Sequence, residues 1–139
     1  MPAGVEYAVF DGVRDLPLFD PDIERDGLTP VAVAALRGAI VVADALLIAS
    51  PEYGHSLPGA LKNAVDWLIG SGELEGKVVG VTTAVVHEAR GRRGLDALLG
   101  TLAAVSARVV GGAGTVLGAG FDDQLRTLLA GIVEAAAAQ

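Results

Sequence analysis

The chain has 139 residues, of which 52% are hydrophobic and 19% charged, enough for one domain with a buried core and a composition that excludes intrinsic disorder. Its net charge of −7 disfavours nucleic acids and anionic membranes as partners, because both are bound by clustered Lys and Arg. The sequence has no cysteine, which excludes disulfides, iron–sulfur ligation and thiolate chemistry. No signal-peptide pattern follows Met1, so we expect a cytoplasmic protein.

Strand-like and helical patterns alternate along the chain. Strands are predicted at residues 5–10, 45–49 and 77–82, with a last strand in two pieces at residues 108–110 and 114–117. Helices are predicted at residues 31–42, 57–69, 94–106 and 121–138. This alternation is typical of an α/β fold in which helices cover both faces of a mainly parallel sheet, and it excludes sandwiches and helical bundles.

A polar loop, SPEYGHSLPG at residues 50–59, directly follows the second predicted strand. Pro51 and Pro58 restrict its backbone, and Ser56 is placed to cap the helix that follows. Ligands of open parallel sheets bind beyond the carboxyl ends of the strands, where this loop is expected to lie. Its residues alone allow two interpretations, a ligand-binding loop and a rigid connection with no further role.

The segment SPEYGHSLPGALKNAVDWL, residues 50–68, resembles the signature of the NADPH-dependent FMN reductase family. That signature reads Ser/Thr-Pro-Glu-Tyr-Asn, two variable residues, Pro-Gly, and a Leu-Lys-Asn helix ending in Asp-Trp. FDGVRDLPLFDPD, residues 10–22, is similar to the family's segment after its second strand, and RGAIVVADALLIASPEY, residues 37–53, to its approach to the loop. The resemblance implies a single domain over residues 1–139, with a three-layer, flavodoxin-like, doubly wound parallel sheet.

The resemblance also implies that FMN lies against this loop. The residues expected at the flavin are Pro51, Glu52 and Tyr53 along the isoalloxazine ring, Gly54 where the family usually has Asn, His55 and Ser56 near the ring edge, and Thr83 and Ala84 on the next loop. Backbone donors on a stiff loop suit the reduced flavin anion, and the flavin itself performs the chemistry. We therefore expect no catalytic side chain and no metal ligand.

By resemblance, the chain is expected to be an oxidoreductase that takes hydride from NADPH or NADH and passes electrons through FMN to a small acceptor such as a quinone or free flavin. A homodimer or homotetramer is expected, with Lys62, Asn63 and Trp67 serving structure and the dimer contact. The aspartate-rich stretch at residues 11–26 is interpreted as a lid or interface arm. The alternative is a flavin-free remnant that acts as an interaction or oligomerisation module through the Trp67 helix.

Two features depart from the family pattern. The sequence lacks a phosphate-binding loop of the form Gly-Ser-x-Arg-x-x-Ser and the first βα unit around it, and losing two charge-assisted hydrogen bonds predicts FMN binding weakened by about 10²- to 10⁴-fold. We expect a start assigned too far downstream; a degenerate copy and a short form that pairs with another chain are the alternatives. In the segment at residues 82–94, larger residues including His87 replace the family's small ones.

Three arginines, Arg90, Arg92 and Arg93, precede the helix predicted at residues 94–106. Positive charge at a helix start interacts unfavourably with the helix dipole, so arginines are not expected at this position without a further reason. One interpretation is an anion site for an NADPH or FMN phosphate. The other is a solvated loop, and we expect the second.

Overall fold

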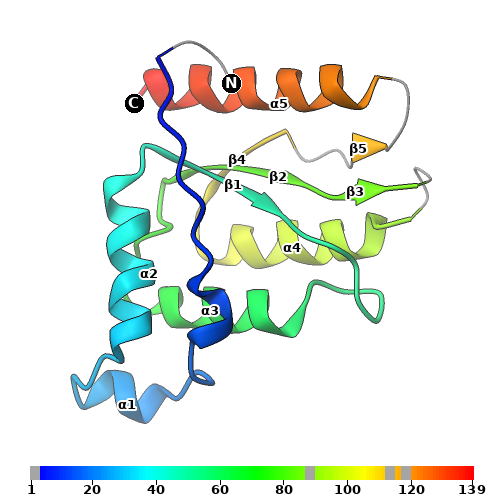
Figure 1. Cartoon of the computed structure of the whole chain (residues 1–139). Helices are drawn as coiled ribbons and strands as arrows, with labels where there is room; N and C mark the ends of the chain where they lie inside the picture. The colour runs from blue at the N-terminus through cyan, green and yellow to red at the C-terminus, as the bar shows by residue number, and fades with distance from the viewer. Residues whose placement is uncertain (1–3, 87–89, 112–114, 117–119) are drawn as a thin grey trace.

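The computed structural model describes residues 4–86, 90–111, 115–116 and 120–139. Helices and strands alternate along these residues as the sequence predicts (Figure 1). The elements are η1 Gly12–Asp15, α1 Pro21–Arg25, α2 Val31–Val42, β1 Ala45–Ala49, α3 Gly59–Ile69, β2 Val78–Thr82, β3 Ala84–Val85, α4 Arg92–Ala104, β4 Arg108–Gly111, β5 Thr115–Val116 and α5 Phe121–Ala137. No helix in this part of the chain is long and apolar enough to cross a membrane.

The main sheet has three parallel strands in the order β1-β2-β4. Ala45 is paired with Val78, and Val78 with Arg108, so the three strands begin level with one another. Two further short strands, β3 and β5, pair in parallel beyond the ends of β2 and β4. The carboxyl ends of β1 and β2 therefore open onto the same edge of the molecule, where the loop at residues 50–58 and the segment after Thr82 begin.

Helices cover both faces of the sheet, which gives three layers (Figure 1). Alternate strand residues point to opposite faces, because side chains alternate along a strand. Leu46, Ile48 and Val79 pack with α2, α3 and α4 on one face, whereas Leu47 and Val78 pack with α5 on the other. All five residues of β2 are buried, as expected of the central strand of a parallel sheet.

Helix α5 approaches the sheet closely at Gly80, in the middle of β2. A Cβ atom at this position would lie 2.2 Å from Cδ1 of Ile132, far inside the normal contact distance. A side chain at this position would displace that of Ile132, so glycine lets α5 pack closely on the sheet here. The helix buries Ile132 and Ala135 there.

The predicted strand at residues 5–10 is wrong. These residues pair with no strand in the described part of the chain, and they run as an extended trace towards η1 (Figure 1). Tyr7 is 65% exposed and Val9 71% exposed. An alternating apolar pattern favours a strand but supplies no hydrogen-bonding partner, and the described sheet offers none to this segment.

The stretch at residues 11–26 contains two short helices that the sequence did not predict, η1 and α1. Its middle is anchored on α3. Asn63 accepts a hydrogen bond from the backbone N–H of Phe19 (2.8 Å), and the side chains of Asn63 and Trp67 both donate to the carbonyl of Pro17 (2.9 Å each). The Phe19 and Trp67 rings also pack edge to face, 5.1 Å apart. This arm is therefore fixed to the fold at Pro17 and Phe19, in keeping with a structural role for Asn63 and Trp67.

The remaining predictions differ little from the structure. The helix at residues 31–42 and the strand at residues 45–49 have the predicted bounds, and the other helices shift by one or two residues. The last strand is divided between the two sheets, as β4 and β5. Ser56 does not cap α3, since the helix begins after Pro58 without a side-chain cap and Ser56 pairs with Tyr53 instead.

Candidate functional site

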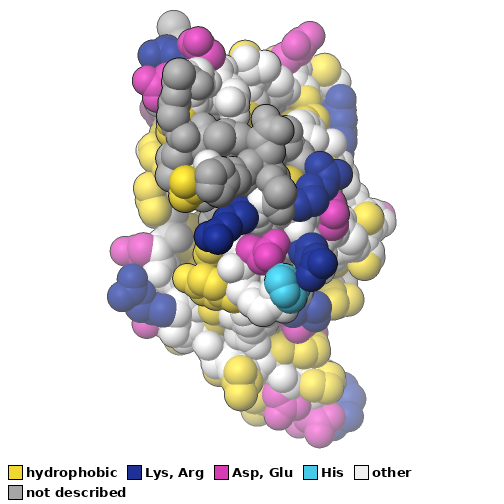
Figure 2. All heavy atoms as spheres, turned by 90° about the vertical axis from the view of Figure 1, so that its right-hand side faces the viewer, with side chains coloured by type: hydrophobic (Ala, Val, Ile, Leu, Met, Phe, Trp, Pro, Cys, Tyr) yellow, Lys and Arg dark blue, Asp and Glu magenta, His cyan; other side chains and the backbone are white. Residues whose placement is uncertain are grey.

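The loop at residues 50–58 lies at the carboxyl end of β1, where the sequence placed it. Figure 2 shows this face of the molecule, with Lys and Arg side chains gathered around an acidic and a histidine side chain. The backbone N–H of Ser50 donates to the carbonyl of Thr82 (2.9 Å), which extends the β1·β2 ladder by one bond and fixes the start of the loop. The loop therefore leaves the sheet at a defined point.

Residues 53–56 form a tight hairpin. Tyr53 and Ser56 exchange backbone hydrogen bonds of 2.9 and 3.0 Å, and the two residues between them both have positive φ, 58° at Gly54 and 63° at His55. This pattern is that of a type I′ turn, which strongly favours Gly or Asn. Histidine tolerates the left-handed region better than most residues, so the turn forms without proline or a second glycine.

The turn presents polar groups to the outside. A Cβ added at Gly54 would meet no atom within 4 Å, and Tyr53 is 66% exposed. Within the described part of the chain, nothing accepts a hydrogen bond from the backbone N–H of Gly54 or of His55. The turn therefore offers two backbone donors and one aromatic ring to a ligand.

The side chain of Glu52 reaches from this loop to the start of α4. Its Oε2 accepts a hydrogen bond from the backbone N–H of Gly94 (2.9 Å), and its Oε1 lies 3.3 Å from Nδ1 of His55. The hydrogen bond from Gly94 lowers the pKa of Glu52 and outweighs partial burial, with a further contribution from His55. The carboxylate is thus ionised and engaged by the protein itself.

Two glycines at the start of α4 lie in close contact with neighbouring segments, and Gly94 is the one that meets this loop. A Cβ atom at Gly94 would lie 2.9 Å from Cβ of Glu52 and 3.0 Å from the carbonyl oxygen of Ser56. Gly91 has φ of 81°, and its Cβ would lie 2.6 Å from Cγ1 of Val85. The loop at residues 50–58 and the first turn of α4 therefore touch at the level of the backbone.

Of the predicted flavin residues, six lie together in the loop after β1, and Thr83 and Ala84 follow β2, the neighbouring strand. Pro51, Glu52, Tyr53, Gly54, His55 and Ser56 form one loop. Thr83 is 3% exposed, and its side chain packs beneath Gly91, while Ala84 is paired with Thr115 in the second sheet. Residues His87–Ala89 lie outside the described residues, so the prediction for His87 has no structural counterpart here.

The three arginines lie at the start of α4: Arg92 and Arg93 are its first two residues, and Arg90 precedes it. Arg92 pairs with Asp96 on the next turn (3.0 Å between Nε and Oδ1), with both side chains more than half exposed. The carboxylate of Glu52 already accepts from the Gly94 N–H, one of the first-turn donors that could bind an external phosphate. The contact between Glu52 and Gly94 was missed in the sequence because 42 residues separate them, and no local pattern links a loop glutamate to a distant helix start.

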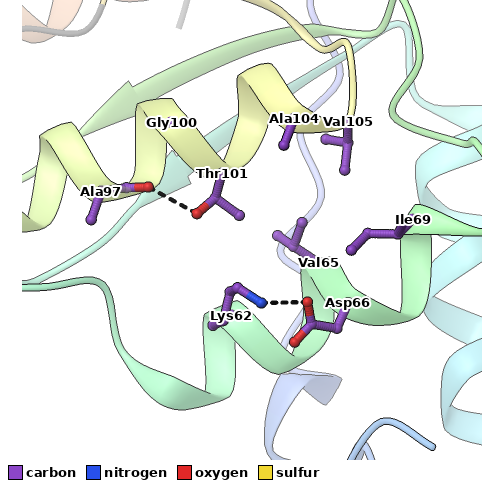
Figure 3. Close-up of a pocket in the computed structure, with 9 residues that line it drawn as sticks. All are labelled: Lys62, Val65, Asp66, Ile69, Ala97, Gly100, Thr101, Ala104 and Val105. Atoms are coloured by element: carbon purple, nitrogen blue, oxygen red, sulfur yellow. Dashed lines mark hydrogen bonds and ion pairs between the residues drawn. The ribbon is translucent and has the colours of Figure 1, made fainter. Parts of the chain in front are cut away.

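A separate groove of about 390 Å³ lies between α3 and α4 (Figure 3). Val65 and Ile69 from α3 face Thr101 and Ala104 from α4 across it, and Lys62 pairs with Asp66 (2.5 Å) at its rim. None of the residues predicted to bind flavin lines this groove. The described residues also contain no group of three or more His, Asp or Glu side chains that could hold a metal ion.

Comparison with known proteins gives matches over most of the chain. A sequence model of a family described as NADPH-dependent FMN reductase matches residues 1–133. A quinone reductase of Escherichia coli is 38% identical over 94 residues, which are 66% of this chain and 50% of that protein. An NAD(P)H-dependent FMN reductase of Pseudomonas aeruginosa is 38% identical over 94 residues, 68% of this chain and 49% of that protein. The chain spans about half the length of these curated relatives.

Solved structures show the same architecture. FerB of Paracoccus denitrificans, a flavoenzyme NAD(P)H:(acceptor) oxidoreductase, superposes with a TM-score of 0.71 at 23% identity, over 89% of this chain and 75% of that one. An oxidoreductase of Corynebacterium diphtheriae gives a TM-score of 0.61 at 22% identity, over 84% of this chain and 68% of the other. These likenesses confirm the predicted flavodoxin-like α/β fold.

Proposed function

Because the chain belongs to the NADPH-dependent FMN reductase family, we propose that it binds FMN against the loop at residues 50–58 and passes reducing equivalents from NADPH or NADH to a small acceptor such as a quinone. The relatives named above include a quinone reductase and an FMN reductase, which supports this choice of donor and acceptor. The observation that carries the proposal is the hairpin at residues 53–56, whose outer donors are open at the carboxyl ends of β1 and β2.

The residues of this loop fit a flavin ring. A flat heteroaromatic ring needs backbone donors at its polar edge and a surface without protruding bulk. The N–H groups of Gly54 and His55 supply the donors, the missing side chain at Gly54 leaves room, and the exposed ring of Tyr53 supplies an apolar surface. The rigid I′ turn holds these groups in place before a ligand arrives, which lowers the entropic cost of binding.

Bound FMN would supply two-electron transfer, in which hydride from NAD(P)H and a proton from water together convert a quinone to a hydroquinone. The chain's own part is to bind and orient. Pro51 and Tyr53 would border the ring, His55 and Ser56 would lie at its edge, and the backbone of Thr83 and Ala84 would approach from the next loop. No side chain is assigned a proton-transfer step, and the carboxylate and imidazole groups of the loop, Glu52 and His55, contact each other.

Charge around the site supports an anionic ligand. The whole chain carries a net charge of −7, yet Lys and Arg side chains gather on the face where the strands end (Figure 2). Arg92 and Arg93 belong to the first turn of α4, which contacts the loop, and Arg90 precedes that turn. A local positive field in an acidic protein raises the concentration of phosphate-bearing nucleotides near the site.

The second candidate function is the flavin-free interaction module, and the groove between α3 and α4 favours it. Ile69 is 59% exposed there, beside the small residues Gly100 and Ala104. Such an apolar groove suits the face of a second copy, which is also the surface we propose for the expected homodimer or homotetramer. Ile69→Asp should then convert the assembly to monomers in sedimentation experiments.

Titration of the purified chain with FMN distinguishes the two functions. We expect FMN fluorescence to be quenched on binding, and NADPH to be consumed when benzoquinone is added to the FMN-loaded protein. A chain that leaves FMN fluorescence unchanged at every concentration and oxidises no NADPH would contradict the reductase proposal. Assembly that persists without FMN would then favour the interaction module.

A further inference from the structure

We propose that Glu52 is a positioning residue that caps helix α4 from a distant part of the chain and thereby fixes the hairpin that faces the ligand. This inference rests on the proposed function in one respect, that the hairpin forms the wall of the FMN site. The contact itself does not depend on FMN.

Helix α4 has no capping side chain of its own. Its N-cap is Gly91, and no side chain at that position bonds the first turn. The first four N–H groups of a helix lack partners within the helix, and a cap normally bonds the second or third of the helical residues. Gly94 is the third helical residue, and its N–H donates to Glu52 at 2.9 Å. Glu52 therefore supplies the capping oxygen that an Asp or Ser side chain at position 91 would otherwise supply.

The same side chain sets the position of the loop. The backbone of Glu52 lies so close to Gly94 that a Cβ atom added at Gly94 would come within 3.0 Å of the Cα of Glu52. The hairpin begins at the next residue, Tyr53, and its last residue, Ser56, also touches Gly94 through its carbonyl. The hairpin is thus held between the end of β1 and the start of α4. Loss of the cap would free one of these two supports.

The charges around Glu52 favour this arrangement. A carboxylate is stabilised at the positive end of a helix, and the Arg92 and Arg93 side chains belong to the same first turn. His55 faces the other carboxylate oxygen at 3.3 Å. Because Glu52 accepts from the Gly94 N–H, that donor is not available to a cofactor phosphate in the native chain.

Three variants test the assignment, Glu52→Ala, Glu52→Gln and the control Glu75→Ala, which removes an exposed carboxylate at the opposite end of the sheet. Two readouts are used, the FMN Kd from fluorescence quenching and the exchange rate of the Gly94 amide proton measured by NMR. Glu52→Ala should raise the Kd about tenfold, because the hairpin that faces FMN loses one of its two supports, and should speed Gly94 exchange. Glu52→Gln keeps an acceptor oxygen and should lie between Glu52→Ala and the native chain, while Glu75→Ala should match the native chain.

Chemical rescue separates capping from general damage to the fold. Sodium formate supplies a free carboxylate of the deleted kind, so it should slow Gly94 exchange in Glu52→Ala and leave the native chain and Glu75→Ala unchanged. A Gly94 exchange rate that is the same in Glu52→Ala and the native chain would overturn the inference. The inference would also be overturned if Gly94 exchange were faster in Glu52→Ala but formate did not slow it, and if the rate were equally fast in Glu52→Gln. If the native chain binds no FMN, the proposed function fails, and the exchange and formate results still decide the role of Glu52.

Discussion

The hairpin at residues 53–56 and the extended segment at residues 5–10 are both exposed, but within the described residues only the hairpin is held in place by hydrogen bonds. The hairpin closes on itself between Tyr53 and Ser56 and is tied to β2 and to α4 on either side. Residues 5–10 make no backbone hydrogen bond with the described part of the chain, and Val9 is 71% exposed. Specific polar contacts fix a segment in one place, whereas an apolar pattern without partners does not.

The middle of the arm, residues 16–19, is intermediate in how firmly it is held, because two side chains of α3 bond to it. Trp67 is fully buried, and we expect Trp67→Ala to lower the free energy of unfolding by about 3–5 kcal/mol, through the cavity and the lost bond to Pro17. The arm should then become as accessible to limited proteolysis as residues 5–10.

Trp67→Phe is the matched control for this variant. It keeps an aromatic ring against Phe19 but removes the donor to Pro17, so we expect a loss of about 1 kcal/mol. Urea denaturation measures both changes. Equal losses in the two variants would show that the hydrogen bond, and not burial of the ring, holds the arm.

The close contact between the hairpin and α4 is broken by Gly94→Ala. The added methyl group meets backbone atoms of Glu52 and Ser56, which cannot swing aside as a flexible side chain can. We expect a loss of about 1–3 kcal/mol in the free energy of unfolding, as for other overpacked sites, and weaker FMN binding.

Gly100→Ala in the same helix provides the comparison. Nothing lies within 4 Å of a Cβ at Gly100, so the replacement should stabilise the protein by about 0.5–1 kcal/mol through the greater helix propensity of alanine. If Gly94→Ala were as stable as Gly100→Ala, the hairpin would not be packed against α4 as the structure shows.

The contribution of Glu52 to stability depends on pH in a defined direction. Its pKa is lowered from 4.5 by the hydrogen bond from Gly94, so the folded state holds the proton less tightly than the unfolded state. This contribution is present above pH 4.5 and is lost as the pH falls through the lowered pKa. We expect the urea midpoint of the native chain to fall more steeply on acidification than that of Glu52→Gln. Identical pH profiles would contradict the contact.

The smallest effect is expected in the segment at residues 5–10. Val9→Ser removes an exposed apolar side chain without a partner in the described part of the chain, so the free energy of unfolding should stay within about 0.5 kcal/mol of the native value. A larger loss in thermal unfolding would mean that this segment is packed, and the contrast with the hairpin would then fail.

Local sequence patterns predicted the helices and strands that are determined by residues close together in the sequence. The helix at residues 31–42 and the strand at residues 45–49 were found with their correct bounds, since apolar periodicity is a local signal. The position of the loop at residues 50–59 followed from the rule that sites lie at the carboxyl ends of parallel strands.

Contacts between distant residues could not be predicted in this way. The Glu52–Gly94 and Trp67–Pro17 hydrogen bonds join residues that are 42 and 50 positions apart. The type of one residue in each pair does not indicate which distant residue it contacts. The I′ turn was also missed, because the Gly-His pair lacks the Asn-Gly sequence typical of such turns. For residues 5–10 the pattern predicted a strand but could not show whether another strand would pair with it.

The most direct test of the account is the response of assigned backbone amides to added FMN, followed by NMR. The account predicts that the Gly54 and His55 signals shift with increasing FMN, while those of residues 5–10 and of the α3–α4 groove stay in place. Shifts confined to the groove residues Gly100 and Thr101, or none at the hairpin when FMN binds, would contradict the claim that the hairpin is the wall of the flavin site.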